Sequence, residues 1–294
     1  MKRLSIALLG LMLNLTAPAQ SSLNEEAPVS DLGHIDVILD SASWYAIKNS
    51  PFIQNEFGVL NVDTTYYSGK PSYDLYVLGQ LNFLHLSLAR GFWNNQKGGA
   101  ALVFQTQKPG QKESLLHTWK QFYPDSLFLH SFKGNDFVLD EIMAWYKPDS
   151  TRLKQPTIFA NLTSYSVDAY KNWGISDSII TAGLAMQQFM GDWGGEPLKS
   201  RLFHSITALY MTINQQELKE IKSVLRATGY TEANNIFTHS FNPTIYITVN
   251  DAKVSSKYSK VKFKLTRSVV KQEIKFGANT ALKLDGKEAW FIFK

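Results

Sequence analysis

The stretch GHIDVILDS, residues 33–41, joins a histidine, a short apolar strand and the start of a helix. His34 opens the strand predicted in HIDVIL, and Asp40 or Ser41 can cap the helix predicted in SASWYAIKNS. A titratable side chain that can bind metals, at the start of a strand, can be interpreted in two ways. It either forms hydrogen bonds at the strand end or is the first ligand of a site, and the second interpretation requires partners further along the chain.

The order of elements around this stretch repeats itself. The strand-like runs NVDTTYYS, SYDLYVLG and NFLHLSLAR follow the helix, so residues 33–90 predict the order β-α-β-β-β. The same order returns over residues 100–166, in the strand AALVFQTQ, the helix ESLLHTWKQF and the strands DSLFLHSF, DFVLDEIMAWY and TIFANLTSYS. This repeat of topology predicts an α+β fold in which β-α-β-β-β units form curved mixed sheets.

The remainder of the chain predicts a linker and a third unit. Residues 167–200 are expected to form a helical linker, made of the helix SDSIITAGLAMQQFM and the loop GDWGGEPLKS. Residues 201–294 predict a C-terminal β-α-β unit followed by further strands. The helix of this unit begins with Asn214 and Glu217, a pair that resembles a capping box.

The N-terminus has the pattern of a signal peptide. Lys2 and Arg3 precede an apolar run, and residues 17–19 form an A-x-A cleavage site. The apolar run is shorter than the roughly 20 residues of a transmembrane helix. We therefore expect removal of residues 1–19, a periplasmic or extracellular protein without membrane insertion, and a flexible lead-in over residues 20–32.

Composition excludes several functional classes. The 294 residues carry a net charge of +5, and this mild, evenly spread charge argues against nucleic acid as a partner. The chain has no cysteine, so disulfides, a thiolate nucleophile and a cysteine-type zinc site are excluded. No G-x-S-x-G nucleophile elbow occurs either.

The first unit resembles a known superfamily. A strand that starts with histidine (GHIDVIL), a helix, and two closing strands with a glycine between them (LYVLGQLNFLHLSL) are similar to the opening half of vicinal oxygen chelate proteins. That superfamily includes glyoxalase-like and bleomycin-resistance-like proteins. The chain also resembles an uncharacterised exported family of Bacteroidota with this glyoxalase-like fold. The resemblance covers residues 33 to about 165 and, more weakly, the C-terminal unit.

The resemblance implies a cleft and a set of site residues. In metal-dependent members, two units curve around a cleft, and histidine and glutamate from their first and last strands hold a divalent metal that binds two adjacent oxygens of a substrate. His34 matches the first-strand ligand, and His85 stands where the last strand of the unit would have glutamate. Histidine suits zinc, iron or nickel. The second unit offers Gln105 on its first strand, and Asn161 and Ser164 on its last.

Two evident ligands are fewer than the three protein ligands that a catalytic zinc site has. The sequence therefore favours a cleft without a tightly bound metal. Asp140 and Glu141 are adjacent, so on a strand they point to opposite faces and only one of them can enter the cleft. The expected ligand-binding residues are His34, His85, Gln105 and Glu141, with His34 and His85 as the candidate metal ligands.

Three functions follow as expectations. The first is an exported protein that binds a small molecule in the cleft between its units. The second is a metal-dependent lyase, isomerase or dioxygenase that acts on a small oxygenated substrate. The third is a surface or periplasmic interaction protein that uses a lysine-bearing strand, on which Lys260, Lys262 and Lys264 share one face. The sequence does not indicate an oligomeric state.

Overall fold

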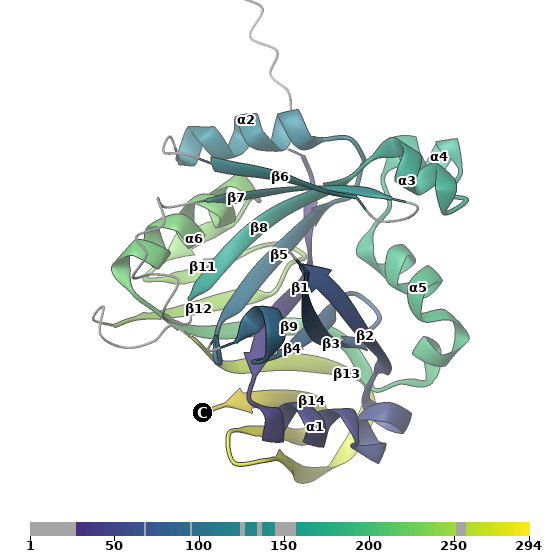
Figure 1. The fold of residues 1–294 in the computed structure, drawn as a ribbon, viewed down its shortest axis with the longest axis vertical. Coiled ribbons are helices and arrows are strands. Elements are labelled where there is room, and N and C mark those ends of the chain that lie inside the picture. The colour runs from purple at the N-terminus through teal and green to yellow at the C-terminus, as the bar shows by residue number, and fades with distance from the viewer. Residues whose placement is uncertain are drawn as a thin grey trace, which may run out of the picture.

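The computed structural model describes residues 28–67, 69–94, 96–123, 127–133, 137–144, 157–250 and 257–294. The predicted signal peptide, residues 1–19, and most of the predicted lead-in lie outside these ranges. The fold is α+β with two mixed β-sheets (Figure 1). The predicted fold class of curved mixed sheets is thus confirmed, and the architecture is consistent with a glyoxalase-like fold.

The larger sheet has the strand order β2-β3-β4-β1-β5-β8-β7-β6. Its strands are Ser30–Leu39 (β1), Val59–Tyr67 (β2), Lys70–Leu78 (β3), Phe83–Leu88 (β4), Ala100–Thr106 (β5), Leu127–Lys133 (β6), Val138–Ala144 (β7) and Ile158–Tyr165 (β8). The two predicted β-α-β-β-β units are its two halves. In each half the first strand pairs in parallel with the last, β1 with β4 and β5 with β8. The halves join where β1 and β5 pair antiparallel.

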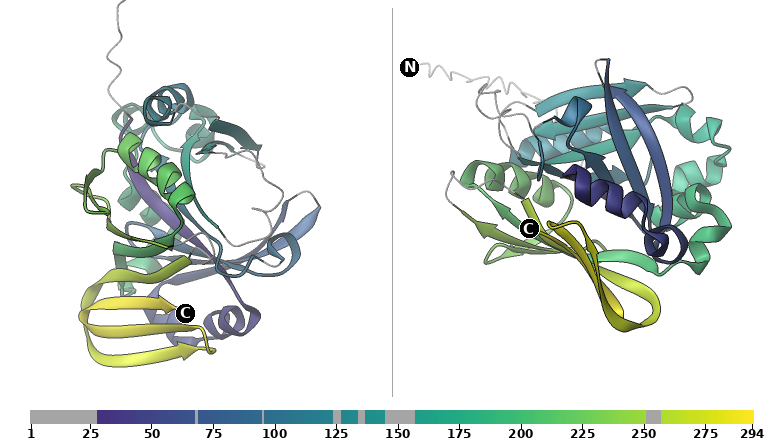
Figure 2. Two further views of the ribbon diagram at one scale, coloured as in Figure 1. Left: turned by 90° about the vertical axis from the view of Figure 1, so that its left-hand side faces the viewer. Right: turned by 60° about the horizontal axis from the view of Figure 1, so that its bottom comes forward.

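The larger sheet curls, so that its two ends bend toward the same side (Figure 2). On β1, Ile35, Val37 and Leu39 face the hydrophobic core on the convex side. Because side chains alternate along a strand, His34 and Asp36 point to the concave side. The concave face of this sheet therefore carries the first candidate site residue.

The smaller sheet has the order β10-β11-β12-β9-β13-β14. Its strands are Phe203–Ile213 (β9), Thr231–Ala233 (β10), Ile236–Thr238 (β11), Thr244–Val249 (β12), Lys257–Phe276 (β13) and Thr280–Phe293 (β14). The helices are Ser41–Lys48 (α1), Lys112–Phe122 (α2), Val167–Asn172 (α3), Asp177–Ala182 (α4), Met186–Ser200 (α5) and Gln215–Ala227 (α6), with a π-helical turn at Ile53–Phe57 and a 3-10 turn at Gly91–Trp93. None of the helices in the described residues combines the length and the apolar character needed to cross a membrane.

Local capping explains two helix starts. Asp40, rather than Ser41, caps α1, since its Oδ1 accepts a hydrogen bond from the Ser43 amide at 2.9 Å. Asn214 and Glu217 form the expected capping box at the start of α6. The Glu217 carboxylate also accepts a hydrogen bond from the Ile158 amide at 3.2 Å, which ties α6 to the first residue of β8.

Two boundaries differ from the sequence-based expectation. The lead-in was expected to reach residue 32, but β1 begins at Ser30, because Ser30–Leu32 pair with β5 ahead of a register shift at Gly33. The segment 191–200, expected to be a loop, forms the second half of α5, but the helix is kinked at Gly195, whose φ of 60° and ψ of −160° are not helical. Gly195 and Pro197 thus interrupt the helix there, while buried residues at every fourth position keep the turns on either side helical. These residues are Met186, Met190, Gly194 and Leu198.

The two sheets share one hydrophobic core. Phe57 lies between the sheets, with its ring centroid 5.5 Å from that of Phe203 on β9 and 5.6 Å from that of Phe263 on β13. Tyr258 on β13 is buried and donates a hydrogen bond to the Ala101 carbonyl of β5 at 2.9 Å. These contacts fix the convex face of the larger sheet against the C-terminal half of the chain.

The turn between β3 and β4 provides the first stability prediction. A Cβ atom on Gly79 would lie 2.6 Å from the Phe203 ring, so we expect Gly79→Ala to lower the free energy of unfolding by about 1–3 kcal/mol through overpacking. Gly191→Ala is the matched control, because nothing lies within 4 Å of its added Cβ and alanine favours the helix. Urea unfolding measures both variants, and equal stability of the two would contradict the prediction.

Candidate functional site

Strand pairing brings His34 and His85 together on the concave face. In the register of β1 and β4, His34 lies opposite Phe83, and Asp36 lies opposite His85. The two imidazole ring centroids are 6.1 Å apart although 51 positions separate the residues. The structure thus places the two sequence-predicted histidines side by side, with Asp36 between them.

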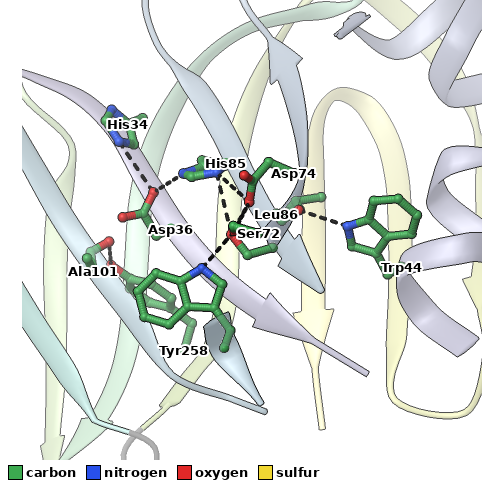
Figure 3. Close-up of polar contacts among 11 residues, drawn as sticks. His34, Asp36, Trp44, Ser72, Asp74, His85, Leu86, Ala101 and Tyr258 are labelled. Atoms are coloured by element: carbon green, nitrogen blue, oxygen red, sulfur yellow. Dashed lines mark hydrogen bonds and ion pairs between the residues drawn. The ribbon is translucent and has the colours of Figure 1, made fainter. Parts of the chain in front are cut away.

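Asp36 links the two histidines (Figure 3). Its Oδ1 atom lies 3.3 Å from His34 Nε2 and 2.8 Å from His85 Nδ1. One ligand atom from each of the three residues falls within 4.8 Å of the others. The three side chains are between 13% and 24% exposed, so the group can be reached from outside. We call His34, Asp36 and His85 the HDH cluster.

Asp74 on β3 holds the Nε2 edge of the His85 ring, the edge that faces away from Asp36. Its Oδ1 atom lies 3.1 Å from His85 Nε2, and its side chain is fully buried. The Ser72 and Ser87 hydroxyls donate hydrogen bonds to the same oxygen at 2.8 and 2.7 Å. The Trp93 indole in turn donates to the Ser72 hydroxyl at 3.0 Å. The orientation of His85 is therefore set by a carboxylate that is itself held in place.

Opposite charges in this group shift the pKa values of its members. Burial acts against the charged form of His85, but Asp36 and Asp74 outweigh it and raise the pKa of His85 to about 10. Burial likewise opposes ionisation of Asp36, yet the two histidines hold the pKa of its carboxyl far below the usual range. The pKa of Asp74 is also lowered, since its hydrogen bond and charge contact with His85 outweigh burial. In the metal-free protein, His85 is thus an imidazolium between two carboxylates.

Aromatic rings border the HDH cluster. The Tyr76 ring stacks on His85 with centroids 4.6 Å apart, and the Phe83 ring stacks on His34 at 4.3 Å. From α5, Trp193 meets Phe83 edge-on at 4.9 Å. Trp193 is 41% exposed, which leaves part of the indole accessible beside Tyr76 and Phe83. The segment expected to be a loop thus supplies an exposed aromatic side chain to the site.

The second unit contributes amide groups to the same face. Asn161 on β8 lies in register with Val103, which itself lies opposite His34, and Gln105 lies opposite Thr163. Gln105 is 7% exposed and Asn161 is 6% exposed. Among the described residues, Asn161 Oδ1 has no hydrogen-bond partner, whereas the Gln105 side chain lies within hydrogen-bonding reach of the Tyr170 hydroxyl. A buried amide atom without a partner is costly, so Asn161 suits a ligand that pairs with it.

Glu141, not Asp140, turns to the concave face. Ile142 is buried in the convex core, so its neighbour Glu141 points the other way, where its carboxylate lies 3.4 Å from His130 Nδ1. Burial raises the pKa of Glu141, and the negative charge of Asp36 adds to this shift. Asp140 instead pairs with Lys112 of α2 at 3.4 Å.

Ser164 has a structural position. Its hydroxyl accepts hydrogen bonds from the Thr106 hydroxyl and from the Gln111 amide, both at 3.0 Å. It therefore joins β5, β8 and the start of α2 and does not enter the cluster.

Sequence reasoning missed Asp36, Asp74, Tyr76 and Trp193. The signal for Asp36 was present, because residues two apart on a strand share a face and His34-x-Asp36 places two metal-binding side chains together. Asp74 and Tyr76 carry no such local signal, since their contribution depends on β3 lying beside β4.

Comparison with known families gives one match. A family model described as a family of unknown function (DUF5829) matches residues 32–293. No curated protein matches the chain.

Proposed function

Because the chain belongs to the DUF5829 family, whose function is unknown, we propose from its site that the protein binds a small molecule on the concave face of the larger sheet. The observation that carries this proposal is that one face holds a partly buried charged cluster, a partly exposed indole and a buried amide, that of Asn161, whose oxygen has no partner among the described residues. A core needs none of these features, and each one matches a group that a ligand can offer.

The surroundings indicate the kind of ligand. The exposed ring of Trp193, which packs against Phe83 and Tyr76, favours a planar or aromatic molecule. Asp36, His34 and the two amides favour polar groups on the same molecule. Ala101 and Val103, opposite Asp36 and His34 on β5, are buried apolar side chains next to the cluster. The proposed ligand is a small aromatic compound with oxygen substituents.

The pairing of two β-α-β-β-β units within one curled sheet supports membership in the vicinal oxygen chelate superfamily. That membership, the suggested Bacteroidota family and export after cleavage near Ala19 are parts of the same proposal. The presence of Asp36 favours the second candidate function, a metal-dependent lyase, isomerase or dioxygenase, because it raises the number of ligand side chains from two to three.

The lysine-bearing strand gives less support to an interaction surface. The Lys260 ammonium lies over the Tyr210 ring, 3.9 Å from its centroid, and Lys262 forms an ion pair with Glu288 at 2.6 Å. These lysines are engaged in contacts within the smaller sheet, as expected for a half-solvated strand.

Binding can be tested with a panel of catechol, protocatechuate and salicylate. We expect at least one to bind in calorimetry, and Trp193→Ala to weaken that binding up to about tenfold, since an aromatic contact is worth about 0.5–1.5 kcal/mol. Trp290→Ala, on the smaller sheet, is the matched control and should leave binding unchanged. The absence of binding across the panel, or equal losses in both variants, would contradict the proposal.

A further inference from the structure

We propose that His34, Asp36 and His85 together bind one divalent transition-metal ion, and that all its protein ligands come from the first β-α-β-β-β unit. This metal proposal deepens the proposed function. It rests on that function in one respect only, the statement that a small molecule occupies the open side of the ion. Binding of the ion itself requires no small molecule, so the two proposals can fail separately.

The positions of the donor atoms carry the proposal. His34 and Asp36 lie two residues apart on β1, and His85 lies directly opposite Asp36 on the parallel strand β4. Asp36 Oδ1 is 3.3 Å from His34 Nε2 and 2.8 Å from His85 Nδ1. With metal–ligand bonds of about 2.0–2.2 Å, neighbouring ligand atoms around one ion are about 2.8–3.6 Å apart, the longer values for tetrahedral geometry. The observed separations are those of neighbouring donors, so an ion can be accommodated by small rotations of the side chains.

Asp74 supplies the outer support that metal-binding histidines usually have. A metal-ligating histidine usually donates its second ring N–H to a carboxylate or carbonyl group. His85 Nε2 faces the buried Asp74 carboxylate at 3.1 Å, which leaves Nδ1 for the ion. The hydroxyls of Ser72 and Ser87 hold that carboxylate. A strand histidine with only a structural role would need no fully buried carboxylate with two hydroxyl donors behind it.

The donor set and its exposure indicate the kind of ion. Two imidazoles and one carboxylate suit zinc and non-haem iron, and three protein ligands leave positions open for water or a ligand. The cluster is partly exposed, and the register positions on β5 next to it hold Ala101 and Val103, which cannot ligate. In the second unit, Asn161 has no acidic or imidazole group. The three protein ligands of the ion would therefore all come from the first unit, and its remaining positions would be left to water or a small molecule.

This arrangement differs from the one that the sequence resemblance implied. That resemblance placed ligands on both units, and it gave only two in this chain. Asp36 makes the first unit sufficient by itself. When bound, the ion would act as a Lewis acid that polarises an oxygen of the small molecule. The chain's own contribution is to hold three donors on one face and to orient His85 through Asp74.

The test uses the whole mature protein, stripped with a chelator and titrated with Co²⁺ as a spectroscopic probe and with Zn²⁺. We expect one equivalent of each ion to bind, visible absorption bands for Co²⁺, and one equivalent of metal by elemental analysis of protein purified without chelators. Asp36→Asn and His34→Gln should weaken metal binding by more than about 100-fold, and Asp74→Asn by about 10–100-fold. Asp36→Asn preserves the shape of the side chain, and circular dichroism verifies its fold.

His130→Gln is the matched control, because His130 also lies beside a carboxylate in the same sheet, Glu141 at 3.4 Å. It should keep wild-type metal affinity. Failure of the wild-type protein to bind an equivalent of Co²⁺ or Zn²⁺ overturns the proposal, as does an equal loss in His130→Gln. If the protein binds no metal but aromatic ligands bind the metal-free protein, the metal proposal is wrong and the small-molecule proposal is supported. Metal binding without any aromatic ligand would leave the metal proposal standing alone.

Discussion

Trp119→Ala is expected to lower the free energy of unfolding by about 3–5 kcal/mol, the range for removal of a fully buried large aromatic side chain. Trp119 lies on α2 and has no exposed surface. Its indole N–H donates a hydrogen bond to the Ser223 hydroxyl of α6 at 2.8 Å. The side chain therefore joins the second unit to α6, and its loss leaves a cavity between them and removes one of the two hydrogen bonds of the Ser223 hydroxyl.

Denaturant unfolding followed by circular dichroism measures this loss. Trp193→Ala is the matched control, because Trp193 is partly exposed on α5 and should cost far less. A Trp119→Ala protein within about 1 kcal/mol of wild type would contradict the packing of α2 on α6 described above.

Replacing His85 with leucine is expected to lower the stability of the metal-free protein by about 3–5 kcal/mol. His85 lies between two carboxylates, 2.8 Å from Asp36 and 3.1 Å from the fully buried Asp74. Without the imidazolium, the fully buried Asp74 carboxylate has no opposite charge beside it and Asp36 keeps only His34, and removing one partner of a buried pair costs about this much. The measurement is urea unfolding in the presence of a chelator, so that loss of metal does not contribute.

The double variant Asp74→Leu/His85→Leu separates this effect from simple loss of packing. Because it removes the fully buried negative charge together with the positive one, its destabilisation should be smaller than the sum of the two single variants. A coupling free energy of about 1–3 kcal/mol is expected for residues in direct contact. Strict additivity would show that the contact between His85 and Asp74 contributes nothing to stability.

Much of the fold could be predicted because it depends on local patterns. Apolar runs such as HIDVIL and AALVFQTQ identified β1 and β5, and the repeated element order identified the two halves of the larger sheet. The second half of α5 was predicted as a loop because its three glycines and one proline are typical of turns. The kink at Gly195 follows that preference, but on either side of it burial of Met190 and Leu198 outweighs local preference, which is a tertiary effect that composition does not contain.

The site was predictable only in part. His34 and His85 were identified by the resemblance to a superfamily, and Asp36 could have been added from strand alternation alone. Asp74 and Trp193 could not, because their places depend on which strand lies beside β4 and on how α5 crosses the sheet edge. Strand alternation fixes which face a residue occupies, but the neighbours on that face are set by pairing over long sequence distances.

The antiparallel contact between β1 and β5 has a consequence for how the sequence of the protein can be varied. It separates the HDH cluster and Asp74, which all lie before residue 90, from Gln105, Glu141 and Asn161, which all lie after residue 100. Two contiguous stretches of gene thus encode the proposed metal-binding side and the opposite side of one surface. Recombination or a mutant library confined to the later stretch can explore new ligands while the earlier stretch stays constant. The protein is in this sense a modular scaffold for directed evolution.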